Sequence, residues 1–293
     1  MQIQWELILF TSLIAWSAGL FGTQALAAVF WRTKKIQLTS WIVAAVLLIG
    51  GGVAVFLHLK HWERIFNGFG HLTSGITQEL IALVILVVVA IAYLVVMLRS
   101  VDKASVPKWL SILAVAVSVI LVVVMAHSYM MVSRPAWDSF IWVAYVLGNS
   151  LVLGPATFVL VAAFAGGIEL KKVGKWLLIG SIANLLFAIA YAVFVQLVGS
   201  SFAEVGMYFD PNHPTKAMAD INAIVDAQIL LLWLGAVIIG SALPVIVAFV
   251  AQKKNDIILW KVFACVIVVC VIAGAIAMRV VFYNLGLSVL MFY

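Results

Sequence analysis

Eight long apolar runs constrain this chain more than any other feature of its sequence. Each run is continuously apolar rather than alternating, and each is close to the roughly 20 residues that an α-helix needs to cross a bilayer. Lipid offers the backbone no hydrogen-bond partners, so only helices and closed barrels span membranes, and the missing alternation excludes strands. The sequence therefore predicts eight transmembrane helices, at residues 7–30, 41–59, 79–98, 109–131, 140–164, 176–198, 224–250 and 258–285.

The composition fits a chain whose main solvent is lipid. Hydrophobic residues make up 66% of its 293 residues and charged residues 10%, whereas an ordinary soluble domain is about 45–50% apolar and about 25% charged. The longest connections, at residues 60–78 and 199–223, are too short to fold alone. We therefore expect an all-α polytopic membrane protein, with a single eight-helix transmembrane domain over residues 1–293.

The basic residues are distributed unevenly between the two sides of the predicted bundle. Twelve lie after helices one, three, five and seven or just inside helix eight, whereas four lie on the opposite side. Basic loops remain in the cytoplasm, so this asymmetry places both termini outside the cell membrane. The charges form short clusters without a basic face interleaved with aromatics, and we therefore expect no nucleic-acid partner. The twelve are Arg32, Lys34, Lys35, Arg99, Lys103, Lys108, Lys171, Lys172, Lys175, Lys253, Lys254 and Lys261.

Polar side chains gather near the outer ends of the predicted helices. His58, His127 and Arg279 each lie roughly 26–30 Å along their helices from the inner interface, by the rise of about 1.5 Å per residue. Glu79 is predicted to open helix three at the same face. Gln196, Asp226 and Gln228 lie at that face too, and the inner half shows no matching set. Ionisable groups inside a membrane are candidates for function.

Simpler roles compete with function for several of these residues. Each histidine alone fits an interfacial or packing role. Glu79 and Asp226 can favour the positive ends of helix dipoles, since both are predicted in a first turn. Arg279 can extend its side chain to the outer surface. Gly50, Gly51 and Gly52 indicate close helix packing.

Oxidation of a quinol suits a one-sided cluster of this kind. The reaction removes two protons and two electrons from a headgroup held among lipid-soluble tails. A histidine and a carboxylate can accept the hydroxyl protons as general bases, and a buried cation such as Arg279 can stabilise the developing oxyanion. These groups must lie near one face, where protons reach water.

Three stretches of the sequence carry a family resemblance. The strongest is Leu57-His58-Leu59, Arg64-Ile65-Phe66-Asn67 and Ser74 to Glu79. Two weaker ones are Pro135-Ala136-Trp137 with Leu153-Gly154-Pro155, and Gly274 to Tyr283. Together with the length and the eight spans, they resemble the DmsC family, the quinol-oxidising membrane anchors of dimethyl sulfoxide reductase-type molybdoenzymes.

The resemblance implies partners, a substrate and site residues. An iron–sulfur subunit would dock on the outer face and a molybdopterin catalytic subunit on that, with no haem or metal in the anchor. The family's site histidine falls on His58 and its acidic partner on Glu79. The sequence departs from the family at Lys60-His61-Trp62, where the family has a Gly-Ser-Pro-like stretch, and at Ala275, where the family usually has an acid.

We interpret the chain as an anchor that oxidises quinol, with menaquinol favoured. His58 and Glu79 are predicted to take its protons and Arg279 to steady the reduced oxygen. The residues predicted to contact the quinol are His58, Arg64, Glu79, His127, Arg279 and Tyr283.

Two alternatives stay open at the level of sequence. His58 and His127, on different helices at similar depth, meet the minimum for a bis-histidine haem b in a quinol-oxidising anchor. A secondary transporter can also gather polar groups at one face, although no span shows the midplane charge or broken helix that transporters favour.

Overall fold

The structure is a computed structural model that describes residues 3–31, 33–59, 61, 70–102, 104–166, 169–198, 221–254 and 256–286. Within these ranges the chain is helical with short connections and has no strand. Eight helices are long and apolar enough to cross a membrane, which confirms the predicted fold class.

The membrane helices follow the chain order of the predicted spans. The first four are α1 (Trp5–Phe30), α2 (Lys34–His58), α3 (Gly75–Arg99) and α4 (Lys108–His127). The next two are α5 (Phe140–Ala165) and α6 (Leu170–Leu197). A short α7 (Ile221–Asp226) precedes the seventh span, which joins the π-helical η3 (Leu231–Ala242) to α8 (Leu243–Lys254). The last span is α9 (Ile257–Asn284).

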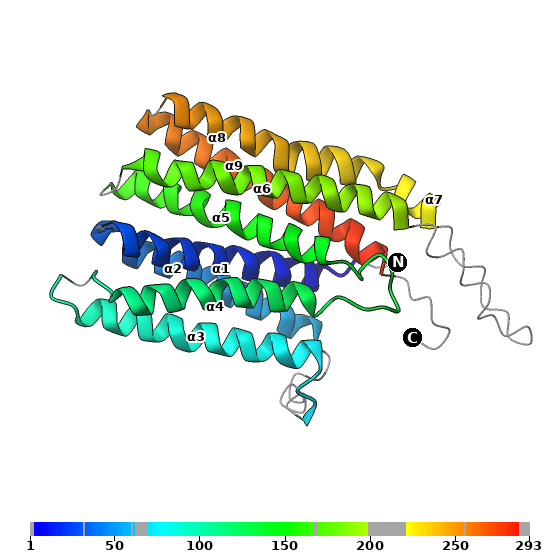
Figure 1. Ribbon diagram of the computed structural model, residues 1–293, viewed down its shortest axis with the longest axis horizontal. Helices are drawn as coiled ribbons and strands as arrows, with labels where there is room; N and C mark the ends of the chain where they lie inside the picture. The colour runs from blue at the N-terminus through cyan, green and yellow to red at the C-terminus, as the bar shows by residue number, and fades with distance from the viewer. Residues whose placement is uncertain are drawn as a thin grey trace, which may run out of the picture.

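The helices form two halves that meet along α1 and α5. In the first half α1 packs against α2 and α4, and α3 packs against α4. In the second half α5 and α9 pack together, and α6, η3 and α8 complete the group (Figure 1). The start of α1 and the end of α9 lie at the same end of the bundle.

Small residues set the close approach of helices in both halves. A Cβ atom on Gly154 of α5 would collide with the backbone of Gly19 in α1, and one on Gly51 of α2 would lie 2.8 Å from Ile14 Cδ1. The predicted packing role of the glycine run is therefore confirmed at Gly51. A Cβ on Gly52 would meet nothing within 4 Å.

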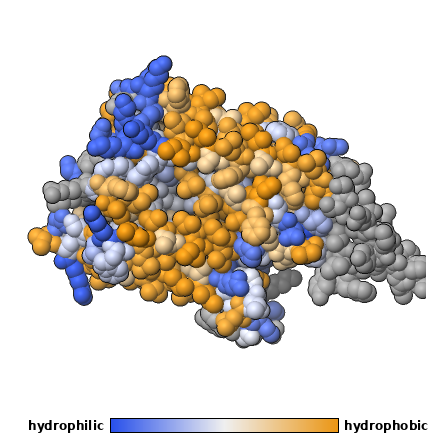
Figure 2. Space-filling view, in the orientation of Figure 1, coloured by the Kyte–Doolittle hydropathy of each residue, from blue (hydrophilic) through white to orange (hydrophobic). Residues whose placement is uncertain are grey.

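The outer surface of the bundle is apolar where lipid would contact it. Hydrophobic atoms cover the middle of the face in Figure 2, and hydrophilic atoms gather toward its ends. Exposed side chains such as Val46 on α2 and Val88 on α3 have 62% and 60% of their surface accessible. This pattern suits a multi-pass membrane protein, because lipid tails solvate apolar side chains.

Two helix boundaries correct the sequence-based expectations about dipoles. The third span begins at Gly75, so Glu79 lies in the second turn of α3 rather than the first. Asp226 is the last residue of α7 and precedes the seventh span instead of opening it. The influence of a helix dipole fades within the first turn, so the dipole explanation is wrong for Glu79. Asp226 still lies just before the start of the seventh span. The fourth helix ends at His127, four residues before the predicted boundary at 131.

A polar cluster also lies at the end of the bundle opposite Glu79, where the sequence predicted none. Gln24 Nε2 of α1 donates to Gln37 Oε1 of α2 at 2.8 Å, and the Tyr93 hydroxyl of α3 donates to the same oxygen at 3.1 Å. Gln37 Nε2 donates to Thr33 Oγ1. All four side chains are buried and neutral. Scattered along the chain as single polar residues, they meet only through packing.

Candidate functional site

Arg279 is the deepest charged side chain of the described residues. It is 0% exposed, and its acceptors come from three helices. Nε donates to Thr11 Oγ1 at 2.9 Å, and Nη1 donates to Asn149 Oδ1 at 3.0 Å and to the Ala275 carbonyl at 3.2 Å. The proposed extension of Arg279 to the outer surface is therefore wrong, because its guanidinium is held inside the bundle by neutral groups.

A line of hydrogen bonds leads from Arg279 toward the middle of the membrane. Asn149 Nδ2 of α5 donates to Asn184 Oδ1 of α6 at 2.8 Å, and Asn184 Nδ2 donates to Ser241 Oγ of η3 at 3.0 Å. Ser241 Oγ donates to the Ala236 carbonyl at 2.9 Å. Asn184 lies about 20 Å from either end of α6. We name Arg279, Asn149, Asn184 and Ser241 the polar chain.

Sequence reasoning missed three members of the polar chain. Asn149, Asn184 and Ser241 are each at most 1% exposed. The signal that could have found them is an amide or hydroxyl in the interior of an apolar run, where an unpaired polar group is costly. In the structure, Ser241 lies in the π-helical η3, and π-helical turns are frequent at functional sites.

Glu79 lies inside the bundle at the end where α3 begins. Its side chain is 9% exposed, and Ser128 Oγ donates to its Oε2 at 3.1 Å. The other carboxylate oxygen, Oε1, is buried and has no hydrogen-bond partner among the described residues. A buried carboxyl oxygen without a donor is costly, and it can accept a hydrogen bond from a bound molecule.

Tyr129 connects the surroundings of Glu79 to those of Arg279. It lies in the connection after α4, and its ring centroid is 5.8 Å from that of Tyr283 and 6.0 Å from that of Phe282. Burial raises the pKa of the Tyr129 phenol well above its ordinary value, with further upward contributions from Tyr283 and Glu79 and a downward one from Arg279. Tyr129 is therefore a protonated hydrogen-bond donor at neutral pH.

Stacked aromatic rings enclose this end of α9. Phe282 lies between Trp137 and Trp142, with ring centroids 4.7 Å and 3.8 Å away. Trp137 Nε1 donates to the Phe282 carbonyl at 2.6 Å, and the Arg134 guanidinium lies 4.4 Å from the centre of the Trp137 ring. Trp142 Nε1 is buried and without a hydrogen-bond partner among the described residues. The Tyr283 hydroxyl interacts with the hydroxyls of Tyr129 and Thr11.

Glu79 of α3 and Arg279 of α9 both influence the phenols of Tyr129 and Tyr283, whose ring centroids lie 5.8 Å apart. We name Glu79, Tyr129, Trp142, Arg279 and Tyr283 the outer cluster, after the side of the membrane on which the sequence predicts it. A family model described as "DMSO reductase anchor subunit (DmsC)" matches residues 1–285. The chain belongs to this family.

Membership of the DmsC family makes the protein the membrane anchor of a DMSO reductase-type enzyme. The sequence-based assignment to this family is thereby confirmed. A comparison with curated proteins gave no match.

The two predicted histidines of this DmsC-family anchor remain at the surface. His58 ends α2 and His127 ends α4, and both side chains are exposed. The His127 ring lies 6.1 Å from that of Phe140. Among the described residues, no hydrogen bond joins His58 to the outer cluster. Arg64, the sixth predicted contact, lies outside the described residues.

The bis-histidine alternative gains no support from the packing of this anchor. Both α2 and α4 pack on α1 rather than against each other. The exposed imidazoles of His58 and His127 therefore end two helices that are not neighbours, whereas haem ligands must face one another.

Proposed function

We propose that this anchor binds and oxidises a quinol, with menaquinol favoured, at the outer cluster. The observation that carries the proposal is the set of open hydrogen-bonding groups there. Glu79 Oε1 can accept from a hydroxyl, and Trp142 Nε1 can donate to an oxygen. A quinol headgroup offers hydroxyls that both donate and accept, which is the chemistry that these two groups lack.

The charges of the cluster suit proton removal. A carboxylate at Glu79 accepts a proton from one quinol hydroxyl as a general base. Arg279 forms no ion pair with an acid of the described residues, so its charge remains available to stabilise the developing oxyanion. A preorganised cation in a dry site costs no reorganisation at the moment of reaction.

His58 has a role beside the buried cluster rather than within it. Its exposed imidazole lies at the same end of the bundle as Glu79, where α2 ends and α3 begins. An imidazole can accept a proton on one ring nitrogen and donate one from the other. We infer that His58 passes protons between the quinol site and water and takes the second proton of the reaction.

An apolar crevice offers a path for the quinol's tail. It lies between α2 and α3, has a volume of about 240 Å³ and is lined by residues such as Leu48, Ile49, Leu86 and Val87. Leu86 follows Glu79 by two helical turns on α3, or about 10 Å. An isoprenoid chain can lie in this crevice while its headgroup reaches Glu79.

The electrons need an acceptor at the same end of the bundle. We propose that an iron–sulfur subunit docks there, with a molybdopterin catalytic subunit bound to it, and that this end faces the outside of the cell membrane. Each quinol would give two electrons to the iron–sulfur subunit and two protons to Glu79 and His58.

A pair of variants tests the proposed base. Removal of a general base costs about 10²–10⁴ in rate, so Glu79→Gln is expected to lower quinol-driven turnover of the assembled complex by that range. Turnover driven by a reduced viologen dye bypasses the anchor and should stay at the parent level, which shows that the complex assembles. His58→Arg should also slow quinol oxidation.

The matched control is Gln78→Glu, which changes the neighbouring exposed residue of α3 and should leave both activities unchanged. The proposal would be contradicted if Glu79→Gln kept quinol-driven turnover within about threefold of the parent. A loss that small is far below the usual effect of removing a general base.

A further inference from the structure

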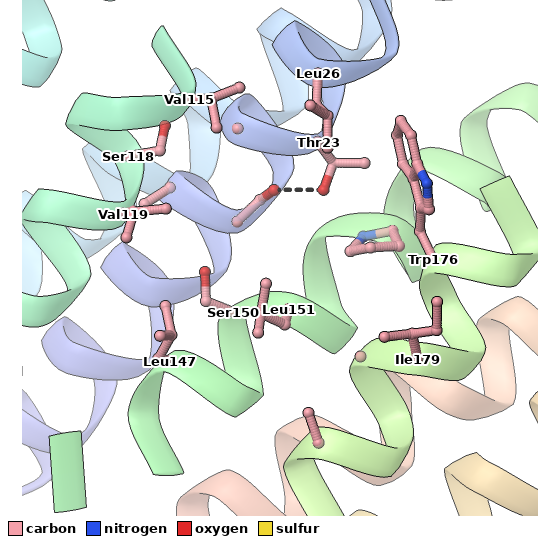
Figure 3. A pocket seen from close by; sticks show the side chains of 16 residues that line it. Thr23, Leu26, Val115, Ser118, Val119, Leu147, Ser150, Leu151, Trp176 and Ile179 are labelled. Atoms are coloured by element: carbon pink, nitrogen blue, oxygen red, sulfur yellow. Dashed lines mark hydrogen bonds between the residues drawn. The ribbon is translucent and has the colours of Figure 1, made fainter. Parts of the chain in front are cut away.

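A second apolar pocket lies between the two halves of the bundle. It has a volume of about 240 Å³ and is lined by side chains of α1, α4, α5 and α6 (Figure 3). Small residues make the hollow, among them Gly19, Gly22, Ser118 and Ala183. None of the outer cluster lines it, so it is distinct from the proposed quinol site.

Two of the hydroxyls in its wall already donate hydrogen bonds within their own helices. Thr23 Oγ1 donates to the Gly19 carbonyl at 2.7 Å, as the dashed line in Figure 3 shows. Ser118 Oγ donates to the Ala114 carbonyl at 2.8 Å. The rest of the wall is mainly aliphatic. A pocket of this kind suits a hydrocarbon chain, because an unfilled void would forfeit the dispersion contacts of its lining.

One end of the pocket carries the marks of a membrane–water interface. Trp176 of α6 lines the pocket and stacks on Trp31, with ring centroids 4.5 Å apart. Phe30 lies edge-on to Trp176 at 6.1 Å. Amphipathic aromatic rings prefer the level of the lipid headgroups. The pocket therefore opens toward the headgroup region at this end.

Lysines continue the pocket-lining face of α6 beyond Trp176. Residues three and four apart share one face of a helix, which places Lys172 and Lys175 in line with Trp176 and Ile179. Both lysines are exposed, and Lys172 Nζ lies 3.0 Å from Glu169 Oε2. Glu169 offsets the charge of Lys172, so Lys175 supplies the net positive charge at the headgroup end of the pocket.

We propose that this pocket binds one anionic phospholipid. An acyl chain would fill the space between α1, α4, α5 and α6, and the phosphate would lie at Lys175 and Lys172. Basic pockets between helices at the membrane surface bind anionic headgroups in this way. The lipid would join the two halves of the bundle, and its site does not depend on the proposed quinol chemistry.

Native mass spectrometry of the full chain within its enzyme complex tests this proposal. Dioleoyl phosphatidylglycerol is the probe, and dioleoyl phosphatidylcholine, with the same chains but a zwitterionic headgroup, is the comparison. The parent protein should retain one phosphatidylglycerol molecule more tightly than phosphatidylcholine. Ala183→Phe should fill the pocket and abolish retention, whereas Lys175→Gln should weaken it about fivefold, as expected for one lysine at the membrane surface.

Two controls repeat the same changes away from the pocket. Ala190→Phe alters an exposed residue two turns further along α6, and Lys254→Gln alters the last residue of α8. Both should bind phosphatidylglycerol like the parent. If Ala183→Phe fails to fold, Val119→Phe fills the pocket from α4 instead.

Three results would overturn the proposal. The first is equal retention of the two lipids by the parent. The second is full retention by a folded pocket-filling variant. The third is displacement of phosphatidylglycerol by a long-chain quinone but not by a short-chain one, which would make the occupant a quinone tail.

Discussion

Arg279 and Glu79 are ionisable side chains of opposite sign that the fold buries without pairing them directly. Each contributes to the electrostatic environment of Tyr129. Thr11 and Asn149 accept hydrogen bonds from Arg279, whereas Ser128 donates to only one of the two carboxylate oxygens of Glu79. Burial of an unpaired charge is expensive. At the scale of the residue, an arrangement that costs stability indicates selection for chemistry rather than for packing.

The Arg279→Met variant distinguishes a chemical role of Arg279 from a structural one. Loss of one donor to a developing oxyanion costs about 10²–10³ in rate, so we expect quinol-driven turnover to fall by that range while dye-driven turnover is kept. The unfolding temperature should change little, because relief of a buried charge offsets the lost hydrogen bonds. Arg99→Met, at the exposed end of α3, should leave turnover unchanged. Collapse of the unfolding temperature with Arg279→Met would show a structural role instead.

At the scale of the element, the polar chain holds η3 against α6. The Ser241 hydroxyl accepts a hydrogen bond from the Asn184 side-chain amide and donates one to the Ala236 carbonyl, five residues earlier. Five residues is also the hydrogen-bond spacing of a π-helix. Gly240 of η3 also lies against Gly274 of α9, where a Cβ on either would collide with the other backbone. The irregular helix is thus fixed by contacts with two neighbours.

Ser241→Ala should lower the free energy of unfolding by about 1–3 kcal/mol, because it leaves the buried Asn184 donor unpaired. Ser181→Ala is the matched control. That buried hydroxyl donates only to the Leu177 carbonyl of its own helix, and its loss should cost less. The free energy of unfolding of both variants can be measured by titration with a denaturing detergent. Equal losses of unfolding free energy in the two variants would show that the Asn184–Ser241 hydrogen bond adds no stability of its own.

At the scale of the whole molecule, polar groups gather at both ends of the bundle but do not connect. The polar chain reaches the middle of the second half, and the Gln24–Gln37–Tyr93 cluster lies at the other end of the first half. Among the described residues no hydrogen bond joins the two. No path of ionisable residues is therefore available across the membrane in this part of the chain.

Turnover should accordingly generate no membrane potential. If the quinol's protons leave on the side where the partner consumes protons to reduce its substrate, no net charge crosses the bilayer. The signal of a potential-sensitive dye in sealed vesicles containing the complex should not change during quinol-driven turnover. A response abolished by an uncoupler would place a proton path through the bundle or move the quinol site to the other face.

The sequence alone determined the number, order and approximate ends of the membrane helices. The reason is that insertion of a helix into lipid depends on the apolar composition of about 20 consecutive residues. Glu79 and Arg279 stood out as ionisable residues in or beside apolar runs, and Tyr283 stood out through the family resemblance. Only the tertiary structure decided that Arg279 is enclosed rather than extended. Asn149, Asn184 and Ser241 emerged only there. Hydropathy assigns a residue to the membrane, but helix packing selects the face it presents and the residues that face it.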